Sequence, residues 1–125
     1  MNKKKIVLIS LVLVVALMSV LLVACNAENY ESKLKNKSYD VKAFGLDDPS
    51  VIAFNNAISG TYKEGIEWKI VASNAIDTVT IFKFNNTKDA KAFAQSDYCY
   101  TFGSFVDRST TCVFVGTEQG VKDAK

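Results

Sequence analysis

The chain of 125 residues contains no histidine and only one proline. Without histidine it cannot activate a nucleophile through a neighbouring imidazole, as Ser-His and Cys-His pairs do. It also lacks the commonest ligand of zinc sites. Glycine-rich phosphate-binding motifs and Asp-x-Asp calcium loops are absent from the sequence as well. We therefore expect no metal ion and no cofactor, and any catalysis would have to depend on carboxylates.

The sequence also has only one long apolar run, which lies at its start. Lysines at positions 3–5 precede residues 6–24, whose only polar members are two serines. A basic segment, an apolar segment and small residues before a cleavage point are the parts of a secretory signal. The run is also long enough to cross a bilayer core of roughly 30 Å as a helix. A retained transmembrane anchor is therefore the alternative to a cleaved signal.

The apolar run ends in the tetrapeptide Leu22-Val23-Ala24-Cys25, which resembles the lipobox of bacterial lipoproteins. The resemblance implies that the Cys25 thiol is diacylated and that the peptide is cut before it. Two acyl chains anchor a protein stably, whereas one binds only marginally. The expected layout is a signal peptide over 1–24, a lipidated N-terminus with a short linker over 25–29, and one domain over 30–125. That domain would face outward from the cell membrane.

The mature chain carries almost no net charge. Removing the lysines at positions 3–5 leaves 12 of the 15 basic side chains, against 13 acidic ones. A dedicated nucleic-acid partner would need a basic surface, so we expect none. Lys33, Lys35 and Lys37 could still attract anionic lipid beside the anchor, although we favour a solvated helix face as their explanation.

Two cysteines remain once Cys25 is assigned to lipid. In an exported domain, Cys99 and Cys112 predict one disulfide. Buried thiols and a redox pair are the alternatives, but the spacing is not that of a Cys-x-x-Cys motif.

Alternating and helical apolar patterns predict an α+β domain with an antiparallel sheet covered by helices on one face. A βαββαβ, ferredoxin-like order with extra N- and C-terminal helices is one candidate topology. We expect Asp48 and Thr87 to cap helices, and Ile66 and Trp68 to share one face of their strand. The expected elements are helix 30–37, strand 38–44, helix 49–59, strand 66–73, strand 78–84, helix 88–96, an edge strand near 104–108, strand 111–116 and a last helix after Thr117.

Aromatic residues concentrate in one segment, where Tyr98, Tyr100, Phe102 and Phe105 surround Cys99. Such a group can form a binding surface for sugars or peptide, or it can be a small core. A carboxylate-dependent hydrolase would instead require convergence of two acids from one set. That set is Asp47, Asp48, Glu64, Glu67 and Asp107.

Most of residues 30–124 resembles small surface lipoproteins of low-GC Gram-positive bacteria. The segments that carry the resemblance are Leu34-Lys-Asn-Lys-Ser-Tyr-Asp-Val41, Asp89-Ala-Lys-Ala-Phe93 and Val115-Gly-Thr-Glu118. This resemblance implies no particular site residues. The expected anchor, the missing histidines and the aromatic segment around Cys99 favour a non-enzymatic binding or accessory domain whose partner is an envelope protein or polymer. A small envelope hydrolase is the alternative.

Overall fold

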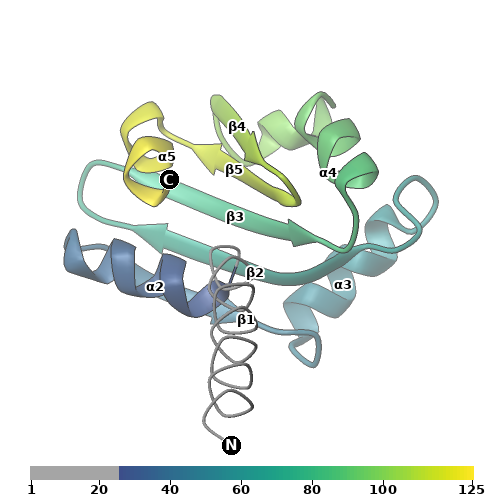
Figure 1. The fold of residues 1–125 in the computed structure, drawn as a ribbon, viewed down its shortest axis with the longest axis horizontal. Coiled ribbons are helices and arrows are strands. Elements are labelled where there is room, and N and C mark those ends of the chain that lie inside the picture. Colours follow the sequence, from purple (N-terminus) through teal and green to yellow (C-terminus); the bar gives the residue numbers. More distant parts are fainter. Residues whose placement is uncertain (1–25) are drawn as a thin grey trace, which may run out of the picture.

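The computed structural model describes residues 26–125 (Figure 1). The predicted signal peptide and the lipobox cysteine lie outside the described residues. Within residues 26–125, no helix is long and apolar enough to cross a membrane.

The described residues form a five-stranded antiparallel sheet with helices packed on it, as the predicted α+β class requires. Its strand order is β1-β2-β3-β5-β4. The strands are β1 (Asp40–Phe44), β2 (Ile66–Ser73), β3 (Thr78–Phe84), β4 (Phe105–Ser109) and β5 (Cys112–Gly116). The helices are α2 (Ala27–Asn36), α3 (Pro49–Ile58), α4 (Thr87–Ala94), the short 3-10 helix η1 (Tyr98–Thr101) and α5 (Glu118–Ala124).

The topology is not ferredoxin-like. In a split βαβ unit another strand lies between the two strands that the helix connects, whereas β1 and β2 are antiparallel neighbours here. The reason lies in α3, which is attached to the beginning of β2. The Asn55 side chain accepts from the Ile66 amide at 2.8 Å and donates to the Ile66 carbonyl at 3.1 Å. The chain therefore returns beside β1.

Helices cover both faces of the sheet, not the single face expected. Side chains of α2 and α5, including Leu34 and Val121, form one core with the sheet. Side chains of α3 and α4, including Phe54 and Phe93, form a second core on the other face. Figure 1 shows α2 and α5 toward one end of the sheet and α3 and α4 toward the other. We call these layers the α2/α5 face and the α3/α4 face.

The prediction that Ile66 and Trp68 share one face of β2 is wrong, because the strand contains a bulge. The register with β3 shifts between Ile66 and Trp68, so the intervening Glu67 interrupts the alternation of side chains. Ile66 consequently packs in the α3/α4 core, whereas Trp68 packs in the α2/α5 core. The side chains of β3 do alternate, since Ile81 and Phe82 belong to opposite cores.

Side-chain caps set where the helices begin. Asp48 caps α3 as predicted, accepting from the Ser50 amide at 2.8 Å. Asn86, rather than Thr87, caps α4, because its extended backbone aims its side chain at the Asp89 amide. Asn26 caps α2, so this helix begins at Ala27 and takes in most of the linker expected over residues 25–29.

Close backbone packing joins β3, β5 and α5. A Cβ atom added at Gly116 would overlap the Thr78 carbonyl oxygen and lie 2.8 Å from Val79 Cα. A Cβ atom at Gly120, in α5, would overlap the same carbonyl. Only glycine allows β5 and α5 to approach β3 this closely.

Replacing Gly116 by alanine should therefore lower the free energy of unfolding by about 3 kcal/mol, because rigid backbone atoms must move apart. Urea unfolding followed by the fluorescence of Trp68 measures the change. Gly60→Ala is the matched control, since a Cβ atom there has no heavy atom within 4 Å. Equal stability of the two variants would contradict this account of the junction.

Candidate functional site

The four aromatic residues proposed as a binding surface do not form one exposed patch. Phe102 contacts the rings of Phe82 and Phe93 in the α3/α4 core. Phe105 packs partly buried against the opposite core. Tyr98 and Tyr100, both in η1, are the two with substantial exposure, at 41% and 53%. The segment thus supplies part of a core and part of a surface.

Tyr98 is held in place by the rings beneath it. Its ring lies nearly parallel to that of Phe54, with an interplanar angle of 13° and centroids 6.3 Å apart. Phe93 and Phe102 contact it edge to face, at centroid distances of 6.0 and 5.4 Å. Offset stacking and edge-to-face packing are the favourable geometries of aromatic pairs. An exposed ring is therefore fixed by contacts within the core.

This ring forms one wall of a shallow hollow of about 450 Å³ between η1 and the end of α3. We call it the aromatic hollow; it is lined by Ala57, Ile58, Thr61, Tyr62 and Tyr98. Tyr62 is only 6% exposed and makes edge-to-face contacts with Phe84 and Phe93. The sequence offered no sign of this role, because Tyr62 stands in a polar turn.

A second hollow, of about 550 Å³, adjoins the first, and Thr61 lines both. We call it the polar hollow; its lining residues are Thr61, Lys63, Glu64, Asn86, Lys88 and Asp89. The Asn86 amide orders two of them, donating to Glu64 Oε2 at 2.7 Å and to Asp89 Oδ2 at 3.1 Å. Both hollows have volumes within the usual range of ligand sites, about 300–1,000 Å³.

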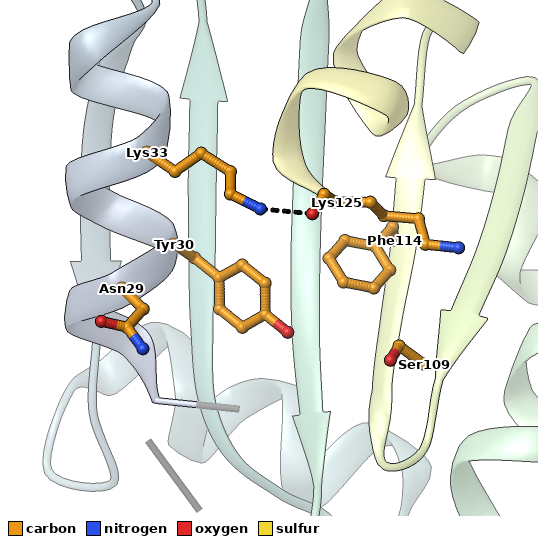
Figure 2. Close-up of a pocket in the computed structure, with 6 residues that line it drawn as sticks. All are labelled: Asn29, Tyr30, Lys33, Ser109, Phe114 and Lys125. Atoms are coloured by element: carbon orange, nitrogen blue, oxygen red, sulfur yellow. Dashed lines mark hydrogen bonds between the residues drawn. The ribbon is translucent and has the colours of Figure 1, made fainter. Parts of the chain in front are cut away.

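A third hollow lies on the opposite face of the sheet, between α2 and the β4–β5 hairpin (Figure 2). This α2 groove, of about 480 Å³, is lined by Asn29, Tyr30, Lys33, Ser109, Phe114 and Lys125. Lys33 Nζ donates to the main-chain oxygen of Lys125, and Lys125 Nζ lies 2.5 Å from Asp107 Oδ2. Both ammonium groups already contact protein oxygens, so the groove attracts anions weakly.

Neighbouring carboxylates also offset the charges of Lys35, in α2, and of Lys37, directly after it. Lys35 pairs with Glu31 and Lys37 with Asp123, each at 3.7 Å. Exposed pairs of this kind contribute about 0–1 kcal/mol to stability. They nevertheless reduce the positive potential that an anionic lipid surface would meet, which favours the solvated-face interpretation.

The acids proposed for hydrolysis form hydrogen bonds within the fold or lie on separate elements. The Ser50 hydrogen bonds that accompany helix capping lower the pKa of Asp48, and the Lys125 ammonium lowers that of Asp107. Glu64 accepts from Asn86. Asp47 precedes α3 and Glu67 stands in β2, whereas Asp107 is on β4 at the far edge of the sheet. Among the described residues, no group of three or more acidic, cysteine or histidine side chains could hold a metal ion.

Cys99 and Cys112 are not joined in the structure, in contrast to the disulfide that the sequence predicts. Both are fully buried, Cys99 in the α3/α4 core and Cys112 in the α2/α5 core. The sheet therefore separates their side chains, and a disulfide needs Cβ atoms that face each other. Burial raises the pKa of the Cys99 thiol to about 12, which opposes redox reactivity as well.

Tyr39 links the end of α2 to α5. Its hydroxyl donates to Asp123 Oδ2 at 2.8 Å. Burial, reinforced by this carboxylate, raises the pKa of Tyr39 to about 12. The same hydrogen bond lowers the pKa of Asp123.

The chain matches no protein family, no curated protein and no solved structure. The resemblance to surface lipoproteins therefore stays a prediction, and a function has to be inferred from the side chains themselves.

Thiol labelling should distinguish buried cysteines from a disulfide. In the folded protein, we expect maleimide to modify neither Cys99 nor Cys112, because both side chains are fully buried. After unfolding without reductant, both should be modified, as peptide mass mapping would reveal. If labelling after unfolding required a reductant, the two cysteines would be joined after all.

The Tyr39 hydrogen bond should make stability depend on pH in alkaline solution. The unfolded chain loses this phenolic proton near pH 10, whereas the folded protein keeps it until about pH 12. Its contribution is therefore complete below pH 10 and is lost as the pH rises toward 12. Tyr39→Phe should cost about 1 kcal/mol at neutral pH and flatten this decline in urea unfolding. Parallel curves for the two proteins would contradict the assignment.

Proposed function

We propose that the chain is an exported lipoprotein, held on the outer side of the cell membrane by diacylated Cys25. We propose further that its domain binds a component of the cell envelope and catalyses no reaction. The observation that carries the binding function is the aromatic hollow, because its exposed Tyr98 ring is fixed by core contacts. Tyrosine side chains held in this way bind with little loss of conformational entropy.

The position of α2 supports this arrangement. The helix begins at Ala27, directly after its cap Asn26, so little chain separates it from the predicted lipid. Tyr30 and Leu34 attach α2 to one face of the sheet, and the aromatic hollow belongs to the other. A membrane anchor at the start of α2 would leave the α3/α4 face accessible to the envelope.

The alternative, a carboxylate hydrolase, receives less support. A glycosidase needs two carboxyl groups on either side of one bond, about 5–10 Å apart. Asp48 and Asp107 are both engaged in hydrogen bonds of the fold, at sites on opposite edges of the sheet. Of the five acids proposed for hydrolysis, only Glu64 lines either hollow, where it and Asp89 both accept from the Asn86 amide.

Intact mass spectrometry of the membrane fraction tests the anchor. The native chain should begin at Cys25 and carry the added mass of a diacylglyceryl group, because two acyl chains hold it in the bilayer. Cys25→Ala should lose that mass and escape processing, while Cys99→Ala should keep it. An unprocessed native chain that resembles Cys25→Ala in mass and membrane attachment would indicate a retained transmembrane helix instead.

A further inference from the structure

We infer that the aromatic and polar hollows act as one groove, joined at Thr61, for a neutral linear glycan of the cell envelope. This inference rests on the proposed function, which supplies the location and the general activity. It adds the chemical class of the ligand and the residues that select it. Thr61 lines both hollows, so a polymer bound in both would pass Thr61 between Tyr98 and Asn86.

The aromatic hollow suits the flat face of a sugar ring. A pyranose presents C–H groups on its faces and hydroxyl groups around its edge, so it needs an apolar platform with polar neighbours. Tyr98 provides the platform, since Phe54 supports its ring at an angle of 13° and 41% of the residue stays exposed. Ala57 and Ile58 extend the apolar wall, and Thr61 supplies a hydroxyl at its end.

The charges of the polar hollow favour an uncharged ligand. Lys63 and Lys88 are balanced by Glu64 and Asp89, so neither an anionic nor a cationic polymer gains a net attraction. All four side chains can still hydrogen-bond sugar hydroxyl groups. Asn86 keeps the two carboxylates in place through its amide.

An extended peptide is the less suitable occupant. Peptides that bind without a fold of their own commonly add a strand to an exposed sheet edge. The walls of the aromatic hollow are the end of α3, the following turn and η1, and none of these is a sheet edge. The amides of Thr61 and Tyr62 both donate to the Ile58 carbonyl, and the Tyr100 amide donates to Asp97. Recognition in this groove must therefore come from side chains.

Surface plasmon resonance on the lipidated full chain, captured in nanodiscs, tests the groove. The probes are a hexasaccharide of N-acetylglucosamine, its disaccharide, a neutral pentapeptide and an anionic polyglycerol phosphate. We expect the hexasaccharide to bind more tightly than the disaccharide, because only the longer chain reaches both hollows. Tyr98→Ala should weaken hexasaccharide binding roughly tenfold or more, as loss of an aromatic anchor does.

Matched variants separate recognition from folding. Tyr98→Phe keeps the ring and should keep most of the affinity even if Tyr98→Ala loosens the core. Tyr100→Ala is the surface control, because Tyr100 stands in the same helix, is 53% exposed and does not line either hollow. Thr61→Trp should block the junction and reduce hexasaccharide binding to the level of the disaccharide.

The outcomes distinguish this inference from the proposed function. Hexasaccharide binding that depends on Tyr98 and Thr61, but not on Tyr100, supports the groove. Binding of the peptide or the anionic polymer in its place overturns the glycan assignment and leaves a binding domain. No binding by any probe overturns the glycan groove, whereas a lipid-free native N-terminus in mass spectrometry would overturn the anchor alone.

Discussion

Strand β5 is buried at every residue, on both of its faces. Phe114 faces the α2/α5 core and Val115 faces the α3/α4 core, each at no more than 1% exposure. A sheet that is apolar on both sides must be covered on both sides. The burial of this strand therefore requires the two helical layers. Gly116, at its end, has no Cβ atom, which lets the backbone of β5 lie close to the backbone of β3.

The two faces differ in how their polar groups are used. On the α2/α5 face, Lys37 and Tyr39 both contact Asp123, and Lys125 contacts Asp107, so charged groups join α2, α5 and the sheet edges to one another. On the α3/α4 face, contacts between aromatic rings hold the elements together, and these contacts extend to the exposed Tyr98. This second arrangement leaves an exposed aromatic ring, held by core contacts, open to a ligand.

Local patterns in the sequence predicted the elements well, and contacts between layers explain what they missed. The bounds of β3 and the Asp48 cap depend on neighbouring residues alone, and both predictions were confirmed. The sequence could not distinguish a disulfide from two separate buried thiols, because counting cysteines does not tell which face of a sheet each occupies. Ile66 was placed on the wrong face because a bulge leaves no mark in the apolar pattern. Tyr98 was a candidate from composition, whereas its neighbour Tyr62 reaches the hollow only through the return of the chain after α3.

The packing that fixes Tyr98 also limits the binding free energy that this residue can supply alone. Phe54, Phe93 and Phe102 already contact part of the Tyr98 ring, and the hollow around it is shallow. One such contact is worth about 0.5–1.5 kcal/mol, far less than association costs in lost translational and rotational freedom. A ligand that touched only this ring would not stay bound. Useful affinity therefore requires a ligand that continues past Thr61 into the polar hollow, and a repeating polymer meets that requirement better than a single small molecule.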